Sequence, residues 1–261
     1  MVIKILALGD VVGECGTKFI SRPGFLSGIK REYGIDLTIA NGENSAKGNG
    51  LTPDSAAALF DAGVDIITGG NHTWQKNQVY SMLDDDSRLV RPANFPGKAP
   101  GNGFTYADVK GIRVLIFNLS GNAFMLEPVA SPYEWADRIL ESEAGKYDVS
   151  VLDFHAETTS EKIAMGWYLD GRVSAVFGTH THVQTADGRV LPKGTGYMTD
   201  IGMCGSMNGV LGVKTECIIH KFTVHTPCRF EEATGDEKLH GAVFEIDSSS
   251  GKCLSVEAIR K

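Results

Sequence analysis

The sequence lacks several features that would each define a class of protein. No two of its five cysteines form a CxxC pair, which excludes a zinc ribbon and a thioredoxin-like motif. No stretch approaches the roughly 20 consecutive apolar residues of a membrane-spanning helix. The apolar run over residues 2–8 is interrupted by Gly9 and Asp10 too soon for a signal peptide. These absences favour a reducing compartment, and we expect a cytoplasmic protein with no membrane partner.

Basic residues are in the minority. The chain has 25 Lys and Arg against 32 Asp and Glu, which gives a formal net charge of −7. This balance argues against an extended nucleic-acid surface, but a small phosphate substrate is still compatible because bound metal ions would dominate the local field. Of the 261 residues 42% are hydrophobic, enough for a sizeable core. We expect a single domain over residues 1–261, with a small cap-like insertion near residues 120–145.

Strand-like and helix-like segments alternate over the first two-thirds of the chain. Thr52 followed by Pro53 is typical of a helix start, and Gly63 of its end. Thr158 and Glu161 form a capping-box pattern ahead of another helix. The last third differs, since the predicted strands at residues 197–200, 216–224, 241–246 and 254–259 have few helices between them. We therefore predict an α/β fold, a two-sheet sandwich flanked by helices in an α/β/β/α arrangement.

Side chains that suit metal binding follow five short apolar runs. They are Asp10, Glu43, Asn44, Asn71, His155, His180 and His182. In open α/β sheets, ligands bind just beyond the carboxyl ends of the strands. Carboxylates, amides and imidazoles delivered to one sheet edge by five strands are difficult to explain by packing alone. The pattern predicts a two-metal hydrolytic site.

The histidines of these segments differ in how strongly each one indicates a metal site. His180 and His182 would point the same way from an extended chain, which suits a chelating pair. Asn71 could be a neutral oxygen ligand, and His72 beside it a proton donor. His155 alone would more often be a satisfied core residue, but its place at the same edge favours a ligand. For each segment, a turn without chemistry is the alternative interpretation.

Two further stretches carry weaker signals. Residues 202–212 are rich in glycine and could cradle a phosphate, but they lack the Lys-Ser/Thr ending of a P-loop, and a flexible loop fits better. Residues 120–135 combine loop-forming and apolar residues and could pack on a second copy, which would make the protein a homo-oligomer.

Taken in order, the motifs resemble the calcineurin-like metallophosphoesterases. That superfamily has an Asp after the first strand, a bridging carboxylate, a Gly-Asn-His, a lone His and a Gly-x-His-x-His. Two departures are informative: Asp10 is followed by Val11 and Val12 instead of x-His, and residues 41–44 read NGEN. With LALGDVVG, GGNHTW and GTHTHVQTAD, these departures resemble the YmdB-like bacterial subgroup.

The resemblance implies a binuclear, often iron-containing centre and phosphodiesterase activity on cyclic nucleotides, of the 2′,3′ or the 3′,5′ kind. One metal would be held by Asp10, Glu43, Asn44 and His182, and the other by Glu43, Asn71, His155 and His180. Glu43 would bridge the two, and manganese or zinc would also suit these ligands. A hydroxide held between the ions is expected to attack phosphorus, with His72 protonating the leaving oxygen.

Three alternatives are open at this point. The same metals would serve a phosphomonoesterase or 5′-nucleotidase, which only the shape of the pocket could decide. A metal-dependent regulatory protein would keep the ligands without needing turnover. His72 favours an enzyme, because it is a residue for chemistry and not for metal binding. An α/β binding module with accidental polar strand ends is the third alternative.

Overall fold

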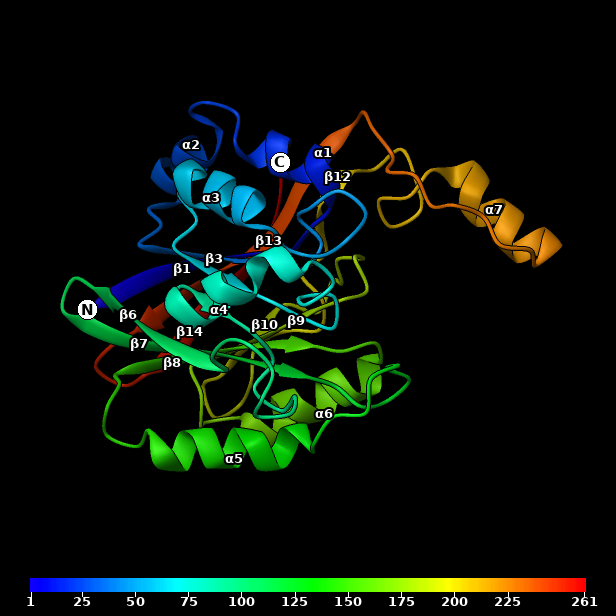
Figure 1. The fold of residues 1–261 in the computed structure, drawn as a ribbon. Coiled ribbons are helices and arrows are strands. Elements are labelled where there is room, and N and C mark those ends of the chain that lie inside the picture. The colour runs from blue at the N-terminus through cyan, green and yellow to red at the C-terminus, as the bar shows by residue number, and fades with distance from the viewer.

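Two β-sheets stack face to face at the centre of the molecule, and helices cover the outer face of each (Figure 1). The computed structural model describes residues 1–261. The eight-stranded sheet has the order β2 (Asp10–Val11), β12 (Met203–Ser206), β13 (Glu237–Asp247), β1 (Val2–Leu8), β3 (Leu37–Asn41), β4 (Ile66–Thr68) and β5 (Leu89–Val90), with β14 (Lys252–Arg260) paired to β13. The six-stranded sheet has the order β10 (Arg189–Val190), β11 (Gly196–Met198), β9 (Ala175–Thr179), β8 (Val149–His155), β7 (Ile112–Ser120) and β6 (Phe104–Val109).

The helices form two groups. The first group comprises α1 (Gly13–Ile20), α2 (Phe25–Tyr33), α3 (Pro53–Ala62), the short 3₁₀ turn η1 (Asn77–Val79) and α4 (Tyr80–Asp85). The second comprises α5 (Pro132–Ser142) and α6 (Thr159–Leu169). A further helix, α7 (Thr215–Val224), projects from the body of the molecule (Figure 1).

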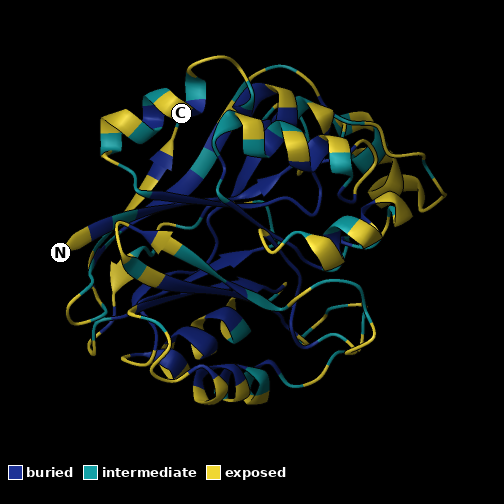
Figure 2. Cartoon of the chain, turned by 60° about the vertical axis from the view of Figure 1, so that its left-hand side comes forward, coloured by how far each residue is buried: buried dark blue, intermediate teal, exposed yellow.

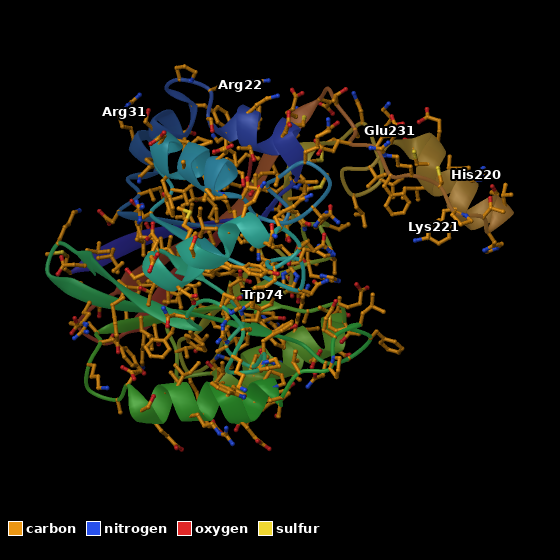
Figure 3. The ribbon with its side chains drawn as sticks, in the orientation of Figure 1. Arg22, Arg31, Trp74, His220, Lys221 and Glu231 are labelled. Atoms are coloured by element: carbon orange, nitrogen blue, oxygen red, sulfur yellow. The ribbon has the colours of Figure 1, made fainter.

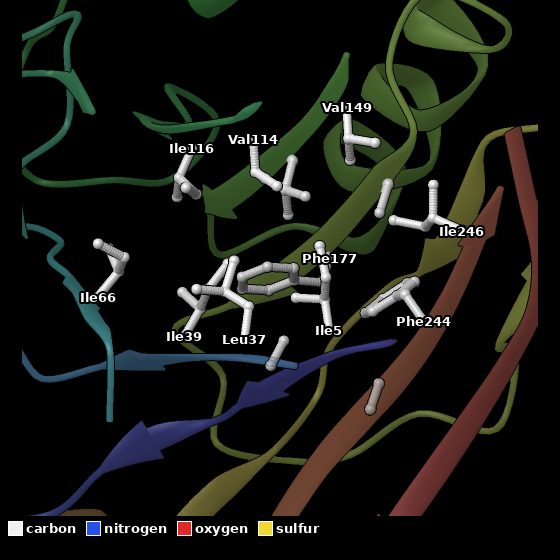
Figure 4. Packing of buried hydrophobic residues seen from close by; sticks show 14 of the residues in the cluster. Ile5, Leu37, Ile39, Ile66, Val114, Ile116, Val149, Phe177, Phe244 and Ile246 are labelled. Atoms are coloured by element: carbon white, nitrogen blue, oxygen red, sulfur yellow. The ribbon is translucent and has the colours of Figure 1, made fainter. Parts of the chain in front are cut away.

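Side-chain alternation along the strands divides the core into layers. In β1, Ile3 and Ile5 face the other sheet, whereas Leu6 and Leu8 pack with residues of α1, α2 and α3. Figure 4 shows the central layer, where Phe177 of the six-stranded sheet packs among residues of the eight-stranded one. A third layer joins the outer face of the six-stranded sheet to α5 and α6. In Figure 2 the central strands are accordingly buried and the helices exposed on their outer faces. The predicted α/β/β/α sandwich is confirmed.

The predicted helix start is confirmed at α3. At α6 only one of the two hydrogen bonds of the predicted capping box is present. The Thr52 side chain accepts a hydrogen bond from the Ser55 N–H, and Gly63 ends α3 with φ of 106°. Thr158 likewise accepts from the Glu161 N–H. The Glu161 carboxylate does not return to Thr158, however; it accepts from the backbone N–H groups of the loop at residues 122–123. Those exposed donors compete for the carboxylate, which a local motif does not reveal.

The last third contains the main corrections. Residues 216–224 were predicted to be a strand, and this prediction is wrong because they belong to helix α7, of which no residue is buried. The glycine-rich stretch at 202–212 is also not simply a flexible loop, since its first part is the buried strand β12. The strands predicted near residues 197, 241 and 254 are confirmed as β11, β13 and β14.

The segment near 120–145 has two parts. Residues 121–131 form a loop on which Phe124 and Leu126 are 90% and 92% exposed, whereas α5 packs on the six-stranded sheet through Ala136 and Ile139. The single-domain organisation, the cap-like insertion and self-association through this loop stay predictions. No helix combines the length and the apolar content needed to cross a bilayer.

Parallel pairing sets the position of the functional site. Strands β1, β3, β4 and β5 run parallel in one sheet, and β7, β8 and β9 in the other. The carboxyl ends of each parallel set therefore meet at one edge, where loops can hold a ligand.

Candidate metal centre

All seven predicted ligands and His72 come together at the edge where these strands end. Asp10 lies on β2, and Glu43 and Asn44 follow β3. Asn71 and His72 follow β4, His155 ends β8, and His180 and His182 follow β9. Hydrogen bonds and close contacts link them into two groups, which share Glu43.

The first group converges on one nitrogen of His155. Its Nε2 lies 3.2 Å from Glu43 Oε1, 3.0 Å from Asn71 Oδ1 and 3.1 Å from His180 Nδ1. His155 and Glu43 are 0% and 1% exposed, so these contacts lie inside the protein. An imidazole nitrogen offers either one proton or one lone pair and cannot satisfy three partners. The ligand atoms of Glu43, His155 and His180 all lie within 4.8 Å of one another, an arrangement that a cation would satisfy.

The second group surrounds a buried oxygen without a partner. Asp10 Oδ1 is buried and makes no hydrogen bond. His182 Nε2 lies 3.6 Å from it, and 3.4 Å from Asn44 Nδ2. Asn44 Nδ2 in turn donates to Glu43 Oε1 at 3.1 Å. An orphaned carboxylate oxygen inside a protein is costly, and a bound cation would remove that cost.

The donor set and the space around it fit a transition metal. Imidazole, carboxylate and amide ligands suit iron, manganese or zinc. At Gly70 a Cβ atom would overlap Glu43 Oε2 and His155 Nε2, so only glycine can stand there. Burial alone would lower the pKa of His155, but the adjacent Glu43 carboxylate raises it to about 9. The pocket thus attracts positive charge, which a metal ion would supply in place of a proton.

The expectation that His180 and His182 point the same way from an extended chain is wrong. His180 and His182 have φ values of 97° and 63°, so the chain is bent and not extended. The bend has a cause: the His180 N–H donates to Asp10 Oδ2, and Thr181 donates twice to Asp200. As a result the two rings reach different groups. His180 meets His155, and His182 meets Asp10.

Residues that orient the histidines were missed by the sequence reasoning. Thr179 Oγ1 donates to Asp153 Oδ1 at 2.7 Å, which leaves its lone pairs to accept from His155 Nδ1 at 2.9 Å. His182 Nδ1 lies 3.1 Å from the Leu211 carbonyl in the same way. In both rings Nε2 is then free to bind a metal. Burial raises the pKa of Asp153 to about 6. A carboxylate inside an apolar strand is a sequence signal that could have identified it.

Replacing Thr179 with valine should weaken metal binding about 10- to 100-fold, because orienting partners of metal-binding histidines have effects of this size. Valine keeps the shape of threonine but neither accepts from His155 Nδ1 nor donates to Asp153. Metal affinity can be measured by titrating the metal-free protein. Thr179→Ser, which keeps the hydroxyl, is the matched control and should bind like the native protein. Equal affinity in both variants would show that the hydroxyl does not orient His155.

A buried ion pair supports the bend at residues 180–182. Lys162 Nζ on α6 lies 2.6 Å from Asp200 Oδ2, and both side chains are 1% exposed. Asp200 also accepts from the N–H and hydroxyl of Thr181 and from the Gly202 N–H. The carboxylate therefore connects α6, the segment after β9 and the approach to β12.

The cavity over the centre contains no cationic side chain. Its volume is about 530 Å³, and its walls include four of the metal-binding candidates (Glu43, Asn44, His180 and His182) and the carboxylates of Glu157, Glu231 and Glu232, but no Lys or Arg. His72 opens onto it with a quarter of its side chain exposed (26%), and its Nδ1 lies 2.9 Å from Asn44 Oδ1. An anionic substrate would be repelled here unless bound metal supplied positive charge.

The two stacked sheets with helices on both outer faces are the fold of the metallophosphoesterase class of α/β proteins. The YmdB-like protein family model matches residues 6–259. The chain therefore belongs to the YmdB-like family.

Similar proteins agree with this assignment over nearly the whole chain. A Bacillus subtilis (strain 168) protein named 2′,3′-cyclic-nucleotide 2′-phosphodiesterase is 46% identical, over 98% of this chain and 96% of its own. The crystal structure of a hypothetical protein from Thermus thermophilus superposes with a TM-score of 0.92 at 39% identity, covering 99% of both chains. A structure described as a novel phosphatase of Mycoplasma pneumoniae has a TM-score of 0.94 at 36% identity, covering 100% of this chain and 94% of that one.

Proposed function

We propose that this protein is a binuclear metal-dependent phosphodiesterase that hydrolyses cyclic nucleotides, of the 2′,3′ kind, the 3′,5′ kind or both. The convergence of three donor atoms on His155 Nε2 carries the metal part of this proposal. Similarity to a named 2′,3′-cyclic-nucleotide 2′-phosphodiesterase supports the diester part. Together they favour hydrolysis of a phosphoric ester, with water as the second substrate.

In this proposal each of the two groups would hold one metal. Asp10, Glu43, Asn44 and His182 would hold one ion, and Glu43, Asn71, His155 and His180 the other. Iron is the metal that we favour, with manganese or zinc as alternatives. When bound, the ions would stabilise the negative charge on the phosphate oxygens. They would also lower the pKa of a water, so that it can lose a proton and attack phosphorus near neutral pH.

His72 is the proton donor in this proposal. Its backbone N–H donates to Glu43 Oε2 at 2.7 Å, which fixes its place beside the centre, while part of its ring faces the cavity. For a 2′,3′-cyclic substrate, a P–O bond to water forms and the P–O2′ bond breaks. The O2′ leaving group takes a proton from His72, the attacking water loses one, and a 3′-monophosphate results.

Chelation is expected to abolish hydrolysis of 2′,3′-cyclic AMP and bis-p-nitrophenyl phosphate. The loss should be roughly 10³-fold or more, because metal charge on the phosphoryl oxygens is worth several kcal/mol. The purified protein would be assayed as isolated, after chelation with metal content measured, and after return of Fe²⁺ or Mn²⁺. Recovery with metal supports the proposal. Full activity in demonstrably metal-free protein would exclude it.

Two other functions are tested by the same assay. The Mycoplasma pneumoniae relative is described as a phosphatase, so a phosphomonoesterase or 5′-nucleotidase is the second candidate. Turnover of 5′-AMP or 3′-AMP without turnover of either diester would favour it. No turnover of any of these by metal-loaded protein would favour a metal-dependent regulatory role. Action in the cytoplasm stays a prediction.

A further inference from the structure

The cavity over the metal centre has both polar and apolar side chains in its wall. Its volume of about 530 Å³ is in the range of pockets that hold whole drug-sized ligands, so a phosphate group would fill only part of it. The polar side chains include Glu43, His72, His180 and His182. The apolar ones are Val12, Leu211, Val213 and Phe230.

Phe230 is the aromatic one among these four apolar side chains. It lies beyond α7, next to Glu231, where the projecting segment of residues 214–230 returns to the body (Figure 3). We call this segment the arm. The Phe230 side chain is 49% exposed, although Lys221 Nζ lies 5.0 Å from its ring centroid. A half-exposed aromatic ring on the wall of a ligand cavity has area available to pack on a ligand.

The charged groups near Phe230 are already engaged. Glu231 forms an ion pair with Lys214 at 2.6 Å. Glu232 accepts from the backbone N–H groups of Glu14 and Gly48, at 3.1 Å and 3.2 Å. These contacts tie the base of the arm to the loops beside the metal centre. Glu232 has no cationic partner, so its negative charge disfavours a second phosphate beside it.

We propose that Phe230 is a specificity residue that stacks on the nucleobase of the substrate while the phosphate lies at the metal centre in the same cavity. This inference rests on the proposed cyclic-nucleotide phosphodiesterase function and deepens it. It makes a nucleoside-bearing diester the substrate class, ahead of simple alkyl or lipid diesters. Every base has an aromatic face, so the contact tolerates all four bases and favours the larger purines.

Kinetics of Phe230 variants test the contact. Phe230→Ala should raise KM for 2′,3′-cyclic AMP about tenfold, the size of one base–aromatic stack, with kcat within about twofold. Phe230→Tyr should restore native KM, whereas Phe230→Leu, apolar but not aromatic, should not. Inhibition by inorganic phosphate, which would occupy only the metal centre, should be unchanged. Phe222→Ala is the matched control, because Phe222 is 70% exposed on the same arm but does not line this cavity.

The outcomes separate this inference from the proposed function. An unchanged KM in Phe230→Ala would overturn the stacking contact. So would an equal rise in Phe222→Ala, or a weakened inhibition by phosphate, since both indicate general disturbance of the arm. If the native protein does not hydrolyse cyclic nucleotides, the proposed function fails by itself. The Kd of 3′-AMP, measured by calorimetry, then decides for Phe230, with a tenfold rise in Phe230→Ala supporting the contact and an unchanged Kd rejecting it.

Discussion

Replacing His72 with alanine is expected to lower kcat for 2′,3′-cyclic AMP by about 10²- to 10⁴-fold, the usual contribution of a general acid. Metal content should stay native, because Asp10, Glu43 and His155 remain in place. The expected loss follows from the chemistry of the leaving group: a sugar alkoxide is a strong base and departs slowly without a proton. Steady-state kinetics with metal analysis of the same samples provide the measurement.

The leaving group gives this experiment an internal control. The p-nitrophenolate of bis-p-nitrophenyl phosphate is a weak base that needs little protonation, so His72→Ala should lose much less activity on it. His220→Ala is a matched variant, because His220 lies on α7 and lines neither the metal centre nor its cavity. Equal losses on the two substrates would indicate that His72 shapes the site, and would remove its role as proton donor.

Replacing Lys162 with methionine is expected to lower the free energy of unfolding by about 3–5 kcal/mol, because it leaves the buried Asp200 carboxylate without its counter-charge. For a chain of this size the midpoint of thermal unfolding should fall by about 10 °C. The side chains are similar in length, so the change removes charge more than volume. Denaturant and thermal unfolding of the metal-free protein measure the effect without a contribution from bound metal.

A double variant distinguishes the charge from the packing. Lys162→Met combined with Asp200→Asn removes both charges and keeps one oxygen acceptor, whereas the native carboxylate accepts from Thr181 through Oδ2 and from Gly202 through Oδ1. It should recover part of the lost stability. If the single variant is as stable as the native protein, the pair is not a stabilising element. If the double variant is no better than the single one, packing and not charge explains the loss.

The layers of the fold could be predicted because they depend on local patterns. The apolar run at residues 2–8 and the capped start at Thr52 act over a few neighbours, and the structure has β1 and α3 at these places. Helix α7 could not be predicted in this way. Its β-branched residues, Ile218, Ile219 and Val224 among them, favour a strand, yet it pairs with no strand and buries no residue. No sheet edge is there to satisfy such a strand, which is a property of the whole structure.

The same distinction holds at the site. Ligand types and strand ends placed all the predicted residues at one edge, and their roles stay predictions. What the sequence could not supply is the set of contacts between distant segments. Thr179 orients His155 through a hydroxyl, and Lys162 reaches Asp200 from an otherwise ordinary helix. A threonine in a strand or a lysine in a helix carries no local sign of such a partner.

The pairing of β1 with β13 has a consequence for synthesis of the protein. Val2–Leu8 lies between β3, which follows it closely, and β13, which is at residues 237–247. Strand β2, which bears Asp10, likewise pairs with residues 203–206, which are synthesised much later. A chain still emerging from the ribosome therefore exposes an open, apolar strand edge at β1, and β2 is without its partner strand. A product truncated before residue 203 would leave both strands without these partners and is expected to aggregate.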